Sequence, residues 1–461
     1  MFAHDSASLR GGAAENRTDT SLRAHPGRLA EDHQSPRFLL SFGDLISIEA
    51  SFILFLFAGR YKNLPELRGF PVDFTLLFFA ATLGLMGWAI VSGKMKPIPL
   101  SLGVVSMISF CAVAAVSLFW SSIYHLNVDK VVRFLLLTSP SFFAAHILAQ
   151  DKNRQERLLR LLVWLSCAIL LYYAYYRWIL GVDVAANVEG EDYANNYLEY
   201  NSHAGILFIV FLCLAVFGSP KQRGIAIIGS GAALFALVAI GGRGPFTSAL
   251  LAIPLLALGL LLHPRGALQR LTRLMVLVSV LMVIAVFGYV GFVRVSGPSA
   301  VWEQLHTLDR YQAQLSGDET HSLDLRLNGQ EDAFRQWQEK PILGWGIGEF
   351  RVQHNDLAYP HNLLLEILME IGLVGAFLFV SVCAVAVIAC VRAAQYGMSS
   401  WVDSGIALLF LADLGSHLTV EGYLADDRIF FAYVGLAIGL RQAAERRRTQ
   451  PVSRLPTLGY P

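Results

Sequence analysis

The sequence has few charged residues for its length. Only 15% of its 461 residues are Asp, Glu, Lys or Arg, whereas soluble domains have about 25%. Apolar residues make up 55% of the chain, and the mean hydropathy is +0.50. A membrane helix needs roughly 20 mostly apolar residues, and the chain contains many such runs. The composition therefore predicts an all-α, polytopic integral membrane protein.

Several signatures of cofactor chemistry are also missing. The five cysteines lie within apolar runs and lack CxxC or Cys/His spacing, so neither a disulfide framework nor a zinc site is predicted. A Walker A motif and a DxD pair are absent, which argues against ATP hydrolysis and metal–nucleotide-sugar chemistry. The glycine-rich run Gly344–Gly348 follows no predicted strand, so we reject a nucleotide loop. We expect no cofactor and no metal, although the acidic stretch Glu189–Asp192 is a place where calcium could bind without EF-hand spacing.

About twelve apolar stretches are long enough to be membrane helices. They cover approximately 42–59, 74–92, 99–120, 130–149, 158–180, 201–217, 224–241, 247–262, 271–293, 362–391, 401–419 and 428–440. With the N-terminal tail inside, 22 of the 36 basic residues fall in inside connections, whereas 181–200 holds five acids and no base. Because inner connections are enriched in Lys and Arg, we expect both termini to be cytoplasmic.

These spans divide the chain into five parts. Residues 1–37 lack the apolar core of a signal peptide and are expected to form a disordered cytoplasmic tail. Residues 38–293 hold spans one to nine, 294–361 a periplasmic loop, 362–440 the last three spans and 441–461 a basic cytoplasmic tail. The loop is predicted to hold two amphipathic helices, one with Leu308, Tyr311 and Leu315 on a face and one with Leu327, Phe334 and Trp337. So long a loop is more typical of a functional cap than of a linker.

His361 and Asn362 follow Pro360 where this loop meets the next apolar helix. A helix N-terminus presents free N–H groups and a positive dipole, which suit a phosphate. The same field would keep an imidazole neutral and able to accept a proton. The alternative is that Asn362 only caps the helix and His361 only faces the interface.

Three arginines occupy the expected outer surface. Arg243 lies in the tight turn Gly241–Pro245 and is either an anion binder or a snorkelling anchor. Arg326 begins the second amphipathic helix, where a nearby aspartate is an equally simple partner. Arg133 lies one turn inside the fourth span, where a charge costs up to about 2.5–3.5 kcal/mol at mid-bilayer and needs a partner or ligand.

Polar residues also open the sixth span. Asn201, Ser202 and His203 lie at its expected outer end, where they either bind sugar hydroxyls or simply cap the helix. We keep Asn201 and His203 as candidate substrate-binding residues, together with Arg133 and Asn362.

The arrangement resembles the O-antigen ligase family, within the O-antigen ligase/polymerase group of membrane glycosyltransferases. His361-Asn362, nine further residues and then Gly372-Leu373-Val374-Gly375 are similar to its ligase signature. Arg326, followed by Trp337, Pro341 and Gly344-Trp345-Gly346, resembles the run that precedes this histidine. Arg243 in its glycine-rich turn matches the family's other recurrent arginine. The span arrangement is similar over most of the chain, and the motifs lie in about 240–375.

The resemblance implies an enzyme of the bacterial inner membrane that moves a glycan from undecaprenyl pyrophosphate to a sugar hydroxyl of lipid A–core at the periplasmic face. It implies His361 as general base, with Arg326, Arg243 and Arg133 on the pyrophosphate, and an inverting, metal-independent transfer. An O-antigen polymerase and a protein O-oligosaccharyltransferase share the donor and stay open. A lipid-linked glycan transporter or flippase is the alternative from another class, disfavoured because the two halves show no evident repeat.

Overall fold

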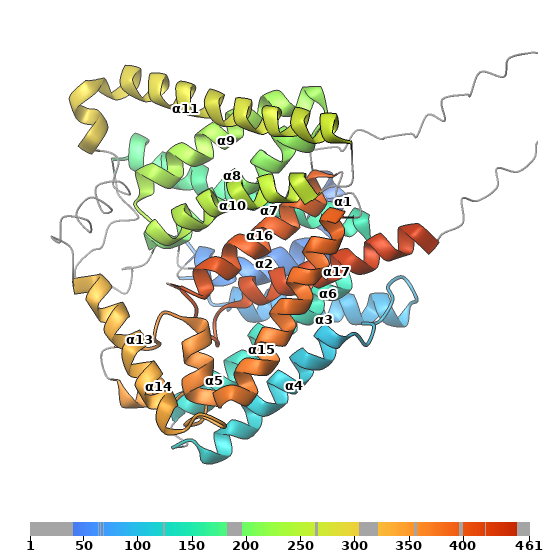
Figure 1. Ribbon diagram of the computed structural model, residues 1–461, viewed down its shortest axis with the longest axis vertical. Helices are drawn as coiled ribbons and strands as arrows, with labels where there is room; N and C mark the ends of the chain where they lie inside the picture. Colours follow the sequence, from blue (N-terminus) through green and yellow to red (C-terminus); the bar gives the residue numbers. More distant parts are fainter. Residues whose placement is uncertain are drawn as a thin grey trace, which may run out of the picture. The chain divides into compact units, whose positions relative to one another are not determined.

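All secondary structure that the computed structural model describes is helical. The described residues are 40–62, 64, 66–67, 69–122, 125–181, 196–262, 266–303, 321–354, 357–395, 400–419 and 421–449. They form, in chain order, α1 (Phe42–Leu45), α2 (Ile48–Tyr61), α3 (Phe74–Val91), α4 (Leu102–Val116), η1 (Ser117–Trp120), α5 (His125–Arg133), η2 (Phe134–Thr138), α6 (Ser139–Leu148), α7 (Lys152–Ala174), η3 (Tyr175–Ile179), α8 (Asn196–Phe217), α9 (Pro220–Ile240), α10 (Arg243–Leu262), α11 (Ala267–Glu303), α13 (His321–Glu339), α14 (Glu349–Gln353), α15 (Leu363–Gln395), α16 (Trp401–His417) and α17 (Arg428–Thr449) (Figure 1). The predicted all-α polytopic class is confirmed.

Nine described helices are long and apolar enough to cross a membrane, fewer than the twelve that we expected. They are Phe74–Val91, Leu102–Trp120, His125–Leu148, Lys152–Ile179, Tyr197–Phe217, Pro220–Ile240, Arg243–Leu262, Ala267–Ala285 and Leu363–Gln395. The other three expected spans correspond to α2 with 14 residues, α16 with 17 and the short apolar helix Arg428–Leu440. These three helical segments lie at the expected positions but are shorter than the other nine, which have 18 or more residues.

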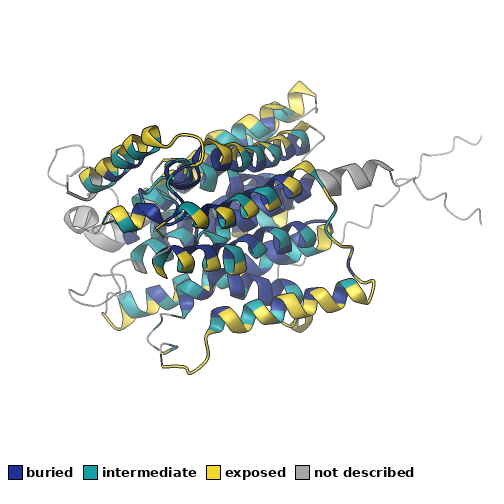
Figure 2. Cartoon of the chain, turned by 90° about the horizontal axis from the view of Figure 1, so that it is seen from below, coloured by how far each residue is buried: buried dark blue, intermediate teal, exposed yellow. Residues whose placement is uncertain are grey.

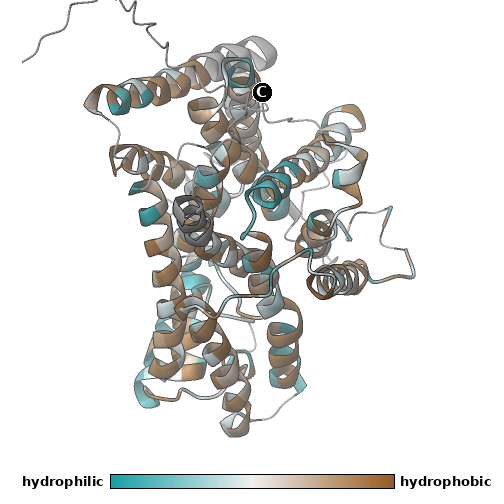
Figure 3. Cartoon of the chain, turned by 90° about the vertical axis from the view of Figure 1, so that its right-hand side faces the viewer, coloured by the Kyte–Doolittle hydropathy of each residue, from teal (hydrophilic) through white to brown (hydrophobic). Residues whose placement is uncertain are grey.

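Helix α8 lies at the centre of the membrane helices. Its apolar window is 89% buried, whereas those of the other eight candidate spans are 17–56% buried. It packs against α7, α9, α10 and α16. The surrounding helices bury one side and expose the other (Figure 2), and apolar residues predominate along their length (Figure 3). Because lipid replaces water around such helices, apolar outer faces are what a bilayer requires.

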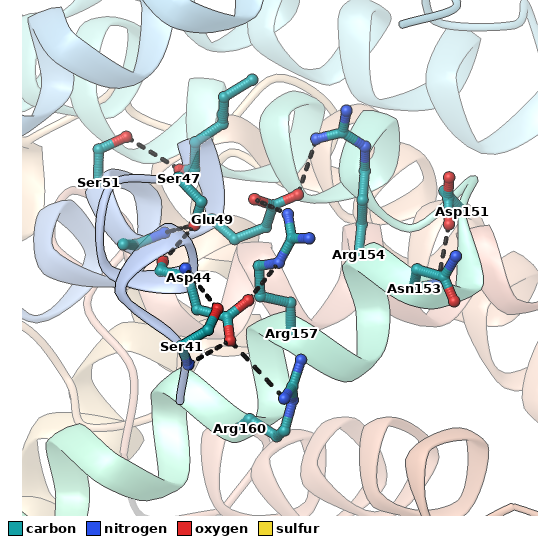
Figure 4. A network of polar contacts seen from close by, with 12 residues as sticks. Ser41, Asp44, Ser47, Glu49, Ser51, Asp151, Asn153, Arg154, Arg157 and Arg160 are labelled. Atoms are coloured by element: carbon teal, nitrogen blue, oxygen red, sulfur yellow. Dashed lines mark hydrogen bonds and ion pairs between the residues drawn. The ribbon is translucent and has the colours of Figure 1, made fainter. Parts of the chain in front are cut away.

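A polar network joins the first turns of α2 and α7 (Figure 4). Arg154 donates to Glu49 at 2.7 Å, and Arg157 donates to Asp44 at 2.9 Å and to Glu49 at 3.2 Å. Arg160 lies 3.7 Å from Asp44. Arg154, Arg157 and Arg160 recur every three residues and therefore share one face of α7. The network fixes the start of α2, in a connection that the sequence assigns to the inner side.

A helix, α13, lies where the second amphipathic helix of the outer loop was predicted, but its buried face differs in part from the one we expected. Leu327 and Phe334 are 52% and 43% exposed. The helix buries Ala333, which packs with Phe350 of α14 and Met369 of α15. Trp337 of the expected face packs against this cluster. The first predicted helix, with Leu308, Tyr311 and Leu315, lies outside the described residues, and α11 continues past the expected loop start at 294 to Glu303.

Candidate functional site

A cavity of about 700 Å³ lies among the ends of α2, α8, α10, α13, α16 and α17. Five residues singled out from the sequence line it together: Arg133, Ser202, Arg243, Arg326 and His361. The cavity reaches Arg60 in the last turn of α2, whereas the Glu49 network occupies the first turn. The two sites are thus at opposite ends of α2, and the cavity is at the end away from Arg154 and Arg157.

His361 lies directly before the start of α15, where contacts with neighbouring elements fix its position. Asn362 caps the helix, because its Oδ1 accepts the Leu365 N–H at 3.1 Å, and its Nδ2 donates to the Leu418 carbonyl at 2.8 Å. Gln330 of α13 donates to the carbonyls of His361 at 3.5 Å and of Thr419 at 3.0 Å. The predicted cap is therefore present, and it also ties His361 to α13 and to the end of α16.

His361 itself has a backbone φ of 54°. Non-glycine residues adopt this left-handed region rarely, at a cost of about 1–3 kcal/mol, and such residues cluster at functional sites. The imidazole packs against Tyr359 in a tilted arrangement, with 4.3 Å between ring centroids, and Tyr359 stacks on Tyr423 at 5.1 Å. The surrounding contacts thus stabilise a backbone conformation that the sequence alone would not favour.

The pKa of His361 is lowered from 6.5 to about 4. Burial of the imidazole is the larger cause, and the positive charge of Arg326 lowers the pKa further. Burial also raises the pKa of the neighbouring Tyr359 phenol. At neutral pH the imidazole is therefore uncharged and the phenol protonated, so the first accepts a proton and the second donates a hydrogen bond.

The glycine of the His-Asn signature is the point at which α15 breaks. Gly372 has φ 73° and ψ −168° inside the helix, a conformation that only glycine adopts readily. The amides of Leu373 and Val374 donate to the carbonyls of Pro341 and Ile342 at 2.8 and 3.3 Å. The helix thus exchanges hydrogen bonds with the turn that follows α13.

That turn completes the exchange with its own amides. Trp345 and Gly346 donate to the carbonyls of Met369 and Glu370 at 2.9 and 2.8 Å, which the break leaves without helical partners. Gly344 has φ 70°, and a Cβ there would lie 2.5 Å from the Glu370 carbonyl. The glycine-rich run that superficially resembles a nucleotide loop therefore docks α13 onto α15 and sets the direction of the segment that begins at His361.

Arg326 and Arg243 reach the cavity from different elements. Arg326, in the second turn of α13, forms no hydrogen bond or ion pair with any residue in the described part of the chain. Arg243 is the first residue of α10, after Gly241 ends α9 with φ 97°. Gly244 lies against Glu421, and a side chain at that position would collide with it. The tight turn thus brings Arg243 close to the loop between α16 and α17.

Arg133 has the protein partners that its position requires. Its Nε donates to Asp129 at 2.9 Å, and its Nη1 lies 3.3 Å from Asp426. It directly precedes the π-helical segment Phe134–Thr138, a distortion that is frequent at functional sites. Arg133 lines the cavity, but both carboxylates already compete for its charge.

Asn201 and His203 do not line the cavity, and both are completely buried. Asn201 Nδ2 donates to the Gly242 carbonyl at 2.6 Å. The His203 ring lies 5.0 Å from that of Phe57, and its Nδ1 is 3.0 Å from the Ser166 hydroxyl. Asn201 therefore holds the turn that carries Arg243, and His203 joins α8 to α2 and α7.

A buried cluster of one lysine and two glutamates lies next to the site. Lys130 Nζ donates to Glu366 at 2.5 Å and to Glu370 at 2.7 Å, and all three side chains are at most 2% exposed. Glu366 also accepts the Leu424 N–H at 3.1 Å, and Lys130 lies 5.1 Å from the Tyr423 ring. Lys130 belongs to α5, Glu366 to the first turn of α15 and Leu424 to the loop that carries Tyr423. The cluster therefore connects these three elements one turn after Asn362.

Sequence reasoning missed further charged residues of the cavity. Arg60, Arg428, Asp413 and His417 all line it. His417 Nε2 lies 3.4 Å from Asp427 and its ring stacks on Phe430. The available signal was an ionisable residue inside or at the end of an apolar helix, which marks a functional site more often than chance.

In the part of the chain that the structure describes, no group of three or more His, Cys, Asp or Glu side chains could hold a metal ion. The acidic stretch Glu189–Asp192 lies outside the described residues. Metal-independent chemistry remains a prediction.

The fold and cavity define a polytopic helical membrane protein with a charged site where several helices end. Residues 228–380, from α9 to the middle of α15, match the family model of the O-antigen ligase. The match confirms the family that the His-Asn signature predicted and marks an O-antigen ligase domain, of the ligase/polymerase type of glycosyltransferase. It includes Arg243, Arg326 and His361. None of the curated proteins matches the chain.

Proposed function

We propose that the protein is an O-antigen ligase, which transfers a glycan from undecaprenyl pyrophosphate to a sugar hydroxyl of lipid A–core at the periplasmic face of the inner membrane. One observation carries the proposal: His361, Arg326 and Arg243 come from three separate elements of the matched segment and line one cavity. A volume of about 700 Å³ lies within the range of pockets that hold drug-sized ligands, enough for a pyrophosphate and an attached sugar.

The chemistry is a single displacement. His361 takes the proton of the acceptor hydroxyl while its oxygen attacks the anomeric carbon of the donor. The bond between that carbon and the pyrophosphate oxygen breaks, the pyrophosphate leaves with the electron pair, and the anomeric configuration inverts. General base catalysis of this kind contributes typically 10²–10⁴-fold.

Two arginines stabilise the negative charge of the leaving pyrophosphate. Arg326, without an ion-pair partner in the described chain, and Arg243 bind the pyrophosphate through charge-assisted hydrogen bonds. Binding of this dianion beside Arg326 offsets the charge that lowers the pKa of His361, because an opposite charge nearby favours the protonated imidazole. The donor thereby strengthens the base that its own transfer requires.

Other assigned residues position the site. Asn362 caps α15, Asn201 holds the Arg243 turn and His203 secures α8. Arg133 is kept as an auxiliary contact, because Asp129 and Asp426 already share its charge.

A lipopolysaccharide gel from a deletion strain tests the acceptor. Loss of a ligase leaves bare core, loss of a polymerase leaves core with one repeat unit, and loss of a protein O-oligosaccharyltransferase leaves the ladder intact. Purified protein should also transfer glycan from the lipid-linked donor with EDTA present and ATP absent. Activity that disappears with chelator and returns with a divalent ion would contradict the metal-independent mechanism.

A further inference from the structure

Two arginines of the cavity, Arg60 and Arg428, have no role in the transfer described above. Arg60 lies in the last turn of α2, and Arg428 is the first residue of α17. Both line the cavity. A Cβ added to Gly59 would lie 3.1 Å from Arg428 Nη2, so the Arg428 side chain runs along the end of α2. The two cations are therefore neighbours on one wall.

Neither guanidinium forms an ion pair with a described residue. Arg60 Nη1 is buried and has no hydrogen-bond partner, and the Arg60 guanidinium lies over the Phe57 ring at 5.3 Å. Arg428 donates to the Phe55 carbonyl at 3.4 Å. The carboxylates whose charges act on the two arginines are not in direct contact with either guanidinium, and they include Glu199, Asp413 and Asp426. Two adjacent, partly buried cations repel each other, and with one guanidinium N–H unsatisfied they form an arrangement that an anion stabilises.

The two pairs of arginines come from different elements. Arg60 ends α2 and Arg428 begins α17, whereas Arg326 lies on α13 and Arg243 begins α10. The cavity is therefore lined by two pairs of cations, and only the second pair belongs to the transfer described above.

Apolar side chains continue from the Arg60 wall. Leu56, Ile206, Ile209, Leu409 and Phe430 also line the cavity. An anion that carries only sugars would leave this surface in contact with polar groups, whereas a phosphate that carries a hydrocarbon chain would cover it. Guanidinium groups suit phosphate because they donate two parallel hydrogen bonds.

We infer that Arg60 and Arg428 form a second phosphate subsite, which binds the lipid-side phosphate of the polyprenyl pyrophosphate while Arg326 and Arg243 bind the sugar-side phosphate. The inference rests on the proposed function for the identity of the donor. The two subsites divide the pyrophosphate: one holds the phosphate that is esterified to the lipid chain, and the other holds the phosphate whose bond to the sugar breaks, and both phosphates leave together on the lipid.

The test measures binding of a tritiated polyprenyl monophosphate to the purified full chain in detergent, without any glycan. Arg60→Gln and Arg428→Gln should each weaken binding at least about 10-fold, as expected for a charge-assisted hydrogen bond. Arg326→Gln should stay within about twofold of wild type, because a monophosphate occupies only the lipid-side subsite. Arg335→Gln, on the exposed side of α13 with 67% of its side chain accessible, is the control for losing one positive charge.

Two further measurements make the result decisive. Arg60→Lys keeps the charge but not the fork, so it should bind with intermediate affinity, and it replaces Arg60→Gln if that variant melts early. Inorganic phosphate should displace the tritiated lipid far less well than the same concentration of unlabelled polyprenyl monophosphate does, because inorganic phosphate makes no contact with the apolar wall.

Wild-type affinity in Arg60→Gln, or an equal loss in Arg326→Gln, would overturn the second subsite. Equal competition by inorganic phosphate would overturn its assignment to a lipid-linked phosphate. Binding that depends on Arg60 in a protein that transfers no glycan would overturn the proposed function and leave the subsite standing. Glycan transfer with unchanged binding by Arg60→Gln would do the reverse.

Discussion

Burial of the His361 imidazole and the positive charge of Arg326 together lower the pKa of His361 to about 4. The two residues come from different elements, α13 and the loop that precedes α15, and the turn docked at Gly372 joins these elements. A general base works best when its pKa lies near the working pH. Under the proposed function, His361 is therefore a weak base until the negatively charged donor is bound.

Replacing Arg326 should move the acid limb of the pH–activity profile to higher pH. A neighbouring cation disfavours the protonated imidazole, so Arg326→Gln raises the pKa of His361 from about 4 toward 6.5. The shift is partial, because burial is the larger cause. In wild type kcat/KM, which reports the free enzyme, should stay flat down to about pH 5. Arg335→Gln should keep the wild-type limb, and a limb that stays in place or moves to lower pH in Arg326→Gln would contradict the pairing.

Replacing His361 should abolish transfer without unfolding the protein. Asparagine tolerates the left-handed backbone and keeps hydrogen bonding, but it cannot accept the proton usefully. His361→Asn should therefore lose about 10²–10⁴-fold in turnover, and His361→Ala and His361→Gln should be similarly poor. Transfer and melting temperature are measured on the same purified samples. His354→Gln is the control, since His354 packs on Phe350 outside the cavity. An active, stable His361→Gln variant would limit His361 to holding the pyrophosphate.

Alanine at Gly372 should lower the free energy of unfolding. Its backbone conformation alone should cost about 1–3 kcal/mol, and a Cβ there would also collide with the Ile342 carbonyl. Gly231→Ala in α9 is the matched control, because a Cβ at that helical position meets no atom within 4 Å. It should be neutral or stabilising by about 0.5–1 kcal/mol. Thermal melts in one detergent compare the two variants, and an unchanged Gly372→Ala would mean that the break is not needed for stability.

Loss of Lys130 should destabilise the protein strongly. Lys130→Met leaves Glu366 and Glu370 buried without their cation, and breaking a buried pair on one side costs about 3–5 kcal/mol. Lys152→Met removes the same charge from an exposed position at the start of α7 and should have little effect. Melting temperatures of both variants give the comparison, and equal values would mean that the cluster is stabilised by other contacts.

The membrane sides can be tested by reporter fusions. Fusions after Lys152, Arg270 and Arg446 should give a cytoplasmic signal, because inner connections collect basic residues. Fusions near Asp192 and Ser316 should give a periplasmic signal. A cytoplasmic signal at Ser316 would place the outer loop on the wrong side and contradict the proposed function.

The sequence predicted the fold class well because lipid imposes strict rules on length and composition. Three of the expected spans form helical segments shorter than the other nine, α2 with 14 residues, α16 with 17 and the apolar part Arg428–Leu440 of α17, because composition does not show where a helix begins and ends. Motif spacing identified His361, Arg326 and Arg243 as site residues, and the structure places them in one cavity. Their catalytic roles stay predictions.

Other parts of the site depend on contacts that spacing cannot show. Lys130 and Glu366 meet across 236 positions of the chain. Arg60 is, in sequence, a lone arginine at the end of an apolar helix and resembles a snorkelling anchor. Asn201 was expected at the substrate, but its position next to the Gly242 turn buries it completely.

The break at Gly372 explains the spacing of the signature, because it fixes the length of the helical segment between Asn362 and Gly372. Nine residues, Leu363–Ile371, separate the cap at Asn362 from the break, and at 1.5 Å per residue they span about 14 Å. Both ends are fastened, one to the end of α16 and the other to the turn after α13. Inserting one residue would rotate everything on one side by about 100° and would leave one fastening out of register.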